Sequence, residues 1–259
     1  CPESRGLGDV YKRQLLGGWA FVVLGHKGLA NLPVILSFGG SFIIGMCFLH
    51  LVPEAYAVTS LAGMFVVLGF LLQGLLELMS KGIEHGHIHA HEHGPNCNQE
   101  FTVRQLPWAA LLSLSIHAAL ECMPVVGPGH HGEHVHGPMG FEAIDWGLVV
   151  GLVMHKVPVA MVLMAMMQEQ HVPRKIAWWV LAAFGLSPLA GMLVFEGIVH
   201  GISAEWLVTF PACMQALVVG ILLHIGTTVL FEAGEGHAFN LKKLAATCVG
   251  IATSLIAFL

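Results

Sequence analysis

The stretch LPVILSFGGSFIIGMCFLHLV, residues 32 to 52, contains no Asp, Glu, Lys or Arg. A helix that crosses the hydrocarbon core of a bilayer needs about 20 mostly apolar residues, and this stretch supplies them. Small residues such as Gly39 and Gly45 are typical of membrane helices that pack closely. An ionisable side chain, His50, lies near the end of the stretch. The stretch therefore predicts a transmembrane helix that carries a polar group close to one membrane surface.

Six further apolar stretches follow and indicate the fold class. They span residues 61–79, 106–126, 146–167, 177–199, 207–230 and 244–259. A shorter stretch, residues 15–24, reads as the end of a truncated helix. The chain is 56% hydrophobic and 10% charged, whereas soluble domains are about 25% charged. We predict an all-α integral membrane protein, an eight-helix transmembrane bundle whose first helix is truncated.

The first fourteen residues, CPESRGLGDVYKRQ, differ from the rest of the chain. They have no initial Met, hold three of the eleven basic residues, and lack the apolar core of a signal peptide. We expect residues 1–14 to be a non-native leader and residues 15–259 to form one transmembrane transporter domain.

Basic residues are distributed unevenly among the predicted loops. Seven of them fall in alternate connections when the helices are threaded in order. These seven are Lys27, Lys81, Arg104, Arg174, Lys175, Lys242 and Lys243. Short loops rich in Lys and Arg stay on the cytoplasmic side. The pattern predicts eight crossings with both termini outside, and from the short loops we expect a bacterial inner (plasma) membrane.

Histidine is frequent, with seventeen residues, and two loops are rich in it. HGHIHAHEH, residues 85–93, is expected in the cytoplasm, and GHHGEHVHG, residues 129–137, outside. Such tracts are typical of metal binding, and solvated polar linkers are the alternative interpretation. We interpret them as sites of loose metal capture. The residues concerned are His85, His87, His89, His91 and His93 in the first tract, and His130, His131, His134 and His136 in the second.

Ionisable side chains also occur inside the apolar stretches, where each costs about 2.5 to 3.5 kcal/mol on insertion scales. His117 and Glu121 are four residues apart and so lie on one helix face. There an imidazole nitrogen and a carboxylate oxygen can bind one metal ion. His50 and Glu54 repeat this spacing, and a further helix supplies His155.

These groups also have simpler interpretations. A His and a Glu at this spacing can form a hydrogen-bonded pair that joins helices, but three helices with such groups favour a metal site. For His224 a helix contact is the better interpretation, and metal ligation is the alternative. Glu77 and Glu196 lie near helix ends, where they can reach water or a loop. The methionine-rich tract 161–167 is assigned to packing or lipid contact.

In their order along the chain, six segments resemble the ZIP family of zinc and iron transporters, and the similarity covers nearly the whole chain after Gln14. The segments are FLHLVPEA (residues 48–55), the region 74–93, SIHAALE (115–121), VMHKVP (153–158), GLSPLAG (185–191) and LVVGILLHIGTTVLFE (217–232), similar in turn to helices two to seven of the family. The resemblance implies an eight-helix ZIP-type bundle with outward termini. It also implies a transport site in which His117 and Glu121 of the fourth helix and His155 of the fifth bind the metal.

Two positions depart from the family's pattern, and both reduce the ligands for a second metal ion. Val159 stands where many members have Glu, and Ala118 stands where Asn is frequent. Lys156, beside His155, stands where many members have a carboxylate, and this pairing resembles a subset that includes animal zinc importers. We expect the Lys156 ammonium group to take the place of a second metal ion.

The expected function is uptake of a divalent transition metal ion into the cytoplasm by alternating exposure of the site. Zn²⁺ accepts two imidazoles, a carboxylate and a water, and Fe²⁺, Mn²⁺ and Cd²⁺ can use the same ligands. His50 and Glu54 would bind the ion first, and residues 85–93 would receive it. Uptake should fall at low pH, because ligand imidazoles must be neutral.

We expect no prosthetic group and no enzyme activity. The net charge of −5 without a basic stripe argues against nucleic acid, so the expected partners are the metal ion and the lipid bilayer, with a homodimer left open. One alternative is an intramembrane metalloenzyme, but the H-E-x-x-H motif is absent, since His91 and Glu92 are followed by His93 and Gly94. Another is a membrane metal sensor without flux, or an exporter on another fold.

Overall fold

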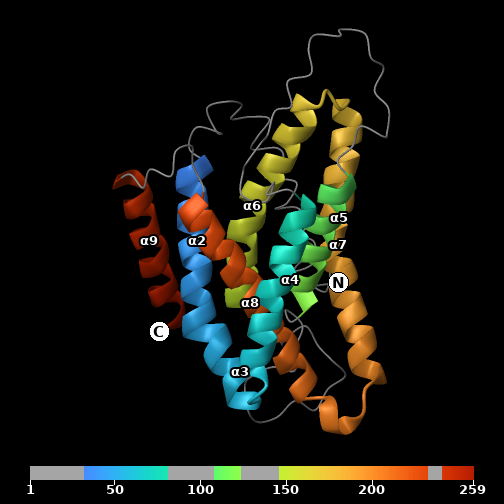
Figure 1. The fold of residues 1–259 in the computed structure, drawn as a ribbon, viewed down its shortest axis with the longest axis vertical. Helices are drawn as coiled ribbons and strands as arrows, with labels where there is room; N and C mark the ends of the chain where they lie inside the picture. The colour runs from blue at the N-terminus through green and yellow to red at the C-terminus, as the bar shows by residue number, and fades with distance from the viewer. Residues whose placement is uncertain (1–31, 81–107, 124–145, 233–240) are drawn as a thin grey trace, which may run out of the picture.

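The computed structural model describes residues 32–80, 108–123, 146–232 and 241–259, and all regular elements in these ranges are helical (Figure 1). The elements are α2 (Leu32–Met46), η2 (Cys47–Leu51), α3 (Val52–Val58), α4 (Ala62–Ser80), α5 (Trp108–Cys122), α6 (Trp146–Glu169), α7 (Arg174–Gly201), η7 (Ala204–Trp206), α8 (Thr209–Glu232) and α9 (Leu241–Phe258). The predicted apolar stretches from residue 32 onward therefore form helices where they are described. The stretch 15–24 and the leader, residues 1–14, lie outside the described residues.

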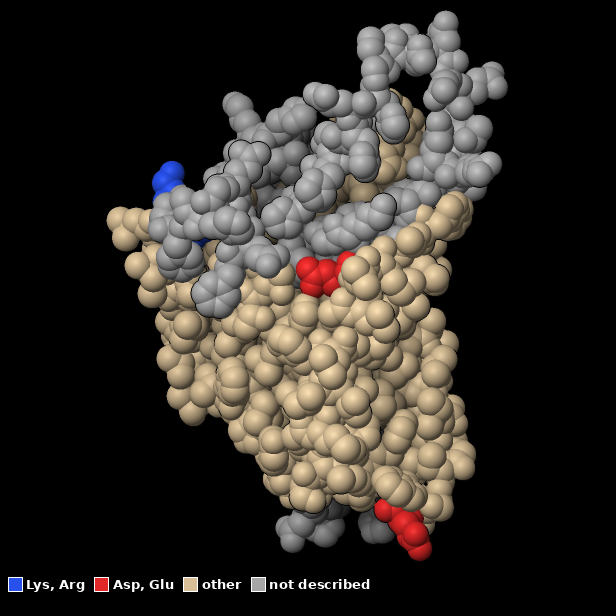
Figure 2. Space-filling view, viewed as in Figure 1, with Lys and Arg blue, Asp and Glu red and all other residues tan. Residues whose placement is uncertain are grey.

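Five helical segments of the described chain are long and apolar enough to cross a membrane. They are Pro33–Val58, Ala62–Met79, Arg174–Gly201, Ala204–Leu230 and Leu241–Phe258. Two shorter apolar stretches, Leu111–Cys122 and Val159–Gln168, lie in α5 and α6. On the face drawn in Figure 2, an uncharged band separates the few charged side chains. These features are compatible with the predicted all-α multi-pass membrane protein.

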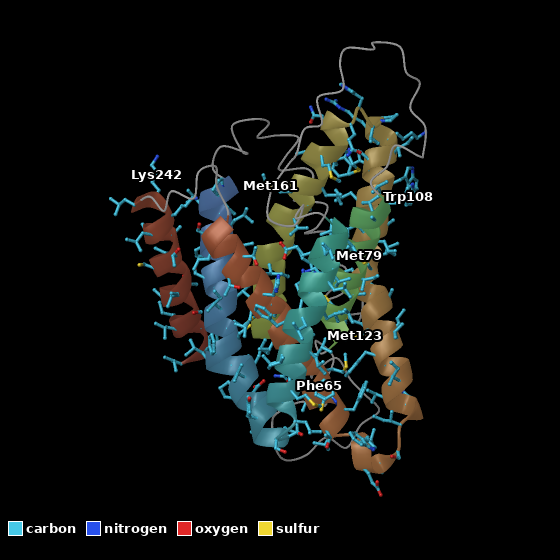
Figure 3. All side chains as sticks on the ribbon, viewed as in Figure 1. Phe65, Met79, Trp108, Met123, Met161 and Lys242 are labelled. Atoms are coloured by element: carbon cyan, nitrogen blue, oxygen red, sulfur yellow. The ribbon has the colours of Figure 1, made fainter. Side chains whose placement is uncertain are left out.

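The helices alternate in direction along the bundle. In Figure 3, α4 runs upward from Phe65 to Met79, and α5 runs downward from Trp108 to Met123. Lys242, at the start of α9, lies at the upper end as well.

The turn between α6 and α7 also lies at this upper end (Figure 1). Helix α7 begins there with Arg174 and Lys175, both of which are exposed. Basic residues of two predicted cytoplasmic connections are thus gathered at one end of the bundle.

Glycines allow several helix pairs to approach closely, as is common between membrane helices. A Cβ atom added to Gly220 of α8 would collide with the backbone of α4 at Val66. A Cβ atom on Gly191 of α7 would collide with the backbone of α5 at Ala119. The second contact lies between the predicted ligand positions of α5, so α7 supports the helix that carries them.

A hydrophobic core joins α5, α6 and α7. It includes the methionine tract of α6, in which Met161, Met164, Met166 and Met167 are 2%, 6%, 5% and 0% exposed. Because these side chains are buried within the bundle, they serve in packing rather than in lipid contact.

The first described helix changes its register near its end. Residues Cys47–Leu51 form a π turn, in which the amide of Val52 donates to the carbonyl of Cys47. Pro53, just beyond the turn, has no amide hydrogen for the carbonyl of Leu49, so a regular α-helical ladder is interrupted here. The helix resumes as α3, and His50 lies within the π turn.

Candidate metal centre

One face of α5 is polar although it is buried. Ser113, His117 and Glu121 follow one another at intervals of four residues and therefore lie on one side of the helix. Their exposed fractions are 0%, 2% and 0%. Polar groups buried this deeply need hydrogen-bonding partners. Ser113 finds one across the helix interface, where its Oγ donates to the carbonyl of Leu76 in α4 at 2.6 Å.

The imidazole of His117 contacts two side chains. Its Nδ1 lies 2.9 Å from Oε1 of Gln73 in α4, and its Nε2 lies 2.9 Å from Oε1 of Glu121. A carboxamide oxygen only accepts hydrogen bonds, so Nδ1 carries the proton in the contact with Gln73. In a neutral imidazole the other nitrogen, Nε2, then has a lone pair. Nε2 lies beside Oε1 of Glu121, but the geometry of the two atoms is not that of a hydrogen bond.

The carboxylate of Glu121 lies between His117 and a lysine of α6. Nζ of Lys156 donates to Oε2 of Glu121 at 2.7 Å, while Oε1 faces the imidazole. Lys156 is 4% exposed, so water screens this ion pair poorly. Lys156 therefore neutralises the carboxylate through one oxygen, and the other oxygen remains directed at His117.

The third predicted ligand, His155, belongs to α6, but its side chain lies outside the described residues. Among the side chains that are described, no three His, Cys, Asp or Glu residues come close enough to hold a metal ion. The structure thus brings together two of the three predicted ligands, His117 and Glu121, and adds Lys156 to them.

The second predicted pair, His50 and Glu54, lies where the π turn meets α3. Nδ1 of His50 is 3.3 Å from Oε1 of Glu54, and these side chains are 27% and 22% exposed. Gln215 of α8 donates from Nε2 to Oε2 of Glu54 at 2.9 Å. The ring of Phe258 in α9 stacks on His50 with centroids 5.1 Å apart. This pair is more accessible than the pair on α5.

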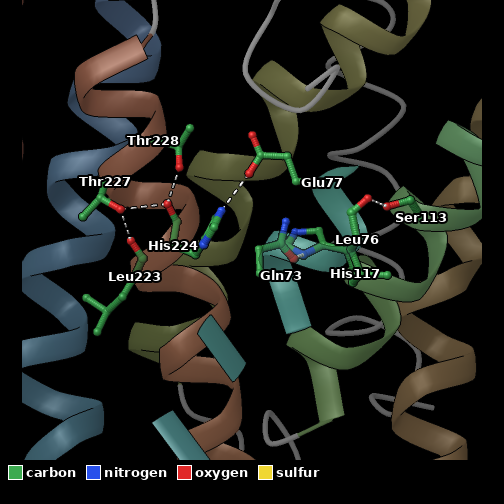
Figure 4. Close-up of polar contacts among 9 residues, drawn as sticks. All are labelled: Gln73, Leu76, Glu77, Ser113, His117, Leu223, His224, Thr227 and Thr228. Atoms are coloured by element: carbon green, nitrogen blue, oxygen red, sulfur yellow. Dashed lines mark hydrogen bonds and ion pairs between the residues drawn. The ribbon is translucent and has the colours of Figure 1, made fainter. Parts of the chain in front are cut away.

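His224 forms a contact between helices. Its Nε2 donates to Oε2 of Glu77 in α4 at 2.7 Å (Figure 4). The ring of Phe70 meets the imidazole edge-on with centroids 4.6 Å apart. Glu77, which we expected to reach water or a loop, is thus the partner of His224. Gly74 of α4 leaves space for this ring, since a Cβ atom there would lie 3.3 Å from Cε1 of His224.

Three polar residues at these contacts were missed by the sequence analysis: Gln73, Ser113 and Gln215. Ser113 could have been found, because it precedes His117 by four residues on the same helix face. Gln73 has the same spacing to Glu77, whereas nothing in the local sequence pairs Gln215 with α3.

The two histidine-rich tracts, residues 85–93 and 129–137, lie outside the described residues. Their predicted role in metal capture therefore remains a prediction. No protein-family model matches the chain, and no curated protein matches it either.

Proposed function

We propose that this protein carries a divalent transition metal ion, zinc first, across a membrane through a site that includes His117 and Glu121. The proposal comprises an eight-helix ZIP-type bundle, uptake toward the cytoplasm, and termini that face outward. Apolar helices, buried polar groups between them, and the motifs that resemble the ZIP family support it. The main observation in favour of the proposal is the contact between the imidazole of His117 and the carboxylate of Glu121.

Nε2 of His117 and Oε1 of Glu121 face each other at 2.9 Å in the buried interior. With Nδ1 protonated toward Gln73, both facing atoms are hydrogen-bond acceptors when the imidazole is neutral. Two acceptors at this distance repel each other, so the arrangement favours a cation between them. A metal ion at this position would accept a lone pair from each atom and so remove the repulsion.

The gap between Nε2 and Oε1 is slightly smaller than a bound zinc ion requires. Tetrahedral zinc with bonds of about 2.0 to 2.2 Å holds neighbouring ligand atoms about 3.3 to 3.5 Å apart. The observed separation of 2.9 Å is shorter by about half an ångström. A small rotation of the Glu121 carboxylate would admit the ion.

His155 is the proposed third ligand, and a water molecule would complete the coordination. The support for His155 is its place in α6 immediately before Lys156, whose ammonium group reaches Glu121. Fe²⁺, Mn²⁺ and Cd²⁺ accept the same ligands, and geometry and availability decide between such metals.

Lys156 supports transport of one ion rather than two. Its ammonium group lies 2.7 Å from the Glu121 oxygen that would otherwise be available to a second cation. We therefore expect one zinc ion per chain in a titration of the wild type. Binding of two ions to the wild type, or unchanged stoichiometry and transport in Lys156→Ala, would exclude this role for the lysine.

Polar groups at different depths support the proposed direction of transport. The accessible pair His50 and Glu54 would take up the ion from outside. The bundle end with Arg174, Lys175 and Lys242 would face the cytoplasm, as short basic loops do, and the histidine tract at 85–93 would receive the ion there.

The decisive experiment is uptake of radiolabelled zinc by proteoliposomes, with a panel of competing divalent metals. His117→Ala and Glu121→Ala should reduce uptake to the level of empty liposomes. His200→Ala and Glu205→Ala are matched controls, because both residues are exposed and, among the residues that the structure describes, Nδ1 of His200 contacts the carbonyl of Glu196 in its own helix. Normal uptake by either site variant would refute the proposed site, and zinc binding without uptake would indicate a sensor.

A further inference from the structure

We propose that Gln73 is a positioning residue for the metal centre, which fixes His117 in the form protonated at Nδ1 and thereby leaves Nε2, the nitrogen beside Glu121, available to a metal ion. The inference rests on the proposed function only in taking His117 as a metal ligand. The hydrogen bond itself can be tested without metal.

The geometry around Gln73 leaves little freedom. Its side chain is fully buried, and its Oε1 lies 2.9 Å from Nδ1 of His117. If the imidazole were instead protonated at Nε2, Nδ1 and Oε1 of Gln73 would both be acceptors and would repel each other in this buried site. The proton would then also occupy Nε2, the nitrogen that we propose as the metal ligand. The carboxamide of Gln73 favours the protonation state that leaves Nε2 available.

The rotational position of α4 about its own axis is also fixed by a second contact, one helical turn from Gln73. Gln73 and Glu77 are four residues apart and lie on one face of α4. Glu77 is bonded to His224 of α8, and Gln73 is bonded to His117 of α5 (Figure 4). The close approach of α8 to α4 at Gly220 adds to this constraint. Rotation of α4 that would withdraw Gln73 from His117 must therefore also break the contact with His224.

Hydrogen-bond partners of metal-binding histidines have a known effect. They set the tautomer and ring orientation, and their loss costs about 10- to 100-fold in metal affinity or activity. We expect Gln73→Met, which keeps the length of the side chain and removes its acceptor, to weaken zinc binding within this range. Gln73→Glu keeps an acceptor and should keep Nδ1 protonated.

A matched control is available at the same helix interface. Ser113→Ala removes a different side-chain hydrogen bond between α5 and α4, which runs from Ser113 to the carbonyl of Leu76. It leaves the Gln73 carboxamide in place. If Gln73 acted only by joining the helices, Ser113→Ala and Gln73→Met would have similar effects on zinc affinity.

The test combines ¹⁵N NMR of labelled histidine in metal-free protein with zinc titration, for the wild type and the three variants. Comparison with His117→Ala assigns the His117 signals. We expect protonated Nδ1 in the wild type, Gln73→Glu and Ser113→Ala, and loss of this preference in Gln73→Met together with weaker zinc binding. A wild-type His117 protonated at Nε2 alone would overturn the inference even if Gln73→Met failed to fold. So would a Gln73→Met protein with wild-type tautomer and zinc affinity, or an equal loss of affinity in Ser113→Ala. A wild type that shows the expected tautomer and binds no zinc would instead refute the proposed function.

Discussion

Lys156 and Glu121 form an ion pair of 2.7 Å between α6 and α5, with exposed fractions of 4% and 0%. Removing one partner from a buried pair leaves an uncompensated charge, which typically costs about 3 to 5 kcal/mol. We expect Lys156→Met and Glu121→Gln each to lower stability, because each leaves one buried charge without its partner in the ion pair. Thermal unfolding in detergent would measure the loss.

The double variant Lys156→Met/Glu121→Gln provides the control for that prediction. Because it leaves no unpaired charge, its loss of stability should be smaller than the sum of the two single losses. Strictly additive losses would show that the two side chains do not interact in the folded protein.

Gly191→Ala should destabilise the protein, whereas Gly197→Ala in the same helix should not. A methyl group at Gly191 meets the backbone of Ala119 in α5, and one at Gly197 meets no atom within 4 Å. Overpacking costs about 1 to 3 kcal/mol, while Ala for Gly in an open helical position gains up to about 1 kcal/mol. Unfolding temperatures of the two variants test this difference, and equal temperatures would contradict the close contact between α7 and α5.

Replacement of Glu77 or His224 by Leu should weaken the contact between α4 and α8. Interhelical hydrogen bonds in membrane proteins contribute about 0.6 to 2 kcal/mol. A double-mutant cycle should therefore give a coupling energy in this range. Thr253→Val is a suitable control, because its hydroxyl is exposed and, within the described part of the chain, donates to the carbonyl of Val249 in the same helix. A coupling energy of zero would argue against the bond.

Gln215→Leu tests the accessible pair near the end of α3. The variant removes the donor that holds Glu54 and leaves the pair on α5 intact. If His50 and Glu54 bind zinc before the transport step, KM for uptake should rise several-fold while kcat changes little. A fall in kcat at constant KM would place Gln215 in the transport step instead.

The helices could be predicted well from the sequence because long apolar stretches indicate helices of this length. The predicted stretch 177–199 corresponds to α7, Arg174–Gly201, which begins after Pro173. Contacts at intervals of four residues were equally readable: His117 and Glu121 are indeed in contact, and so are His50 and Glu54. For His117 and Glu121 a single regular helix determines the geometry, whereas His50 and Glu54 come together where the π turn meets α3.

Contacts between helices could not be predicted in the same way. The bonds of Gln73 to His117 and of Glu77 to His224 depend on which helices are neighbours and on the rotation of each about its axis. Neither the neighbours of a helix nor its rotation can be read from the pattern of residues within that helix. The role of Lys156 was expected from a family resemblance, but its bond to Glu121 was not.

The π turn at Cys47–Leu51 inserts one residue into the turn that precedes Pro53. One residue corresponds to about 100° of rotation around a helix axis, so the azimuth of α3 differs by that angle from the direct continuation of α2. The insertion is what aims Glu54 at Gln215. Deleting a single residue from this turn would restore a continuous α-helix through Pro53. The carboxylate of Glu54 would then point in a different direction, away from Gln215, although neither Glu54 nor Gln215 had been changed.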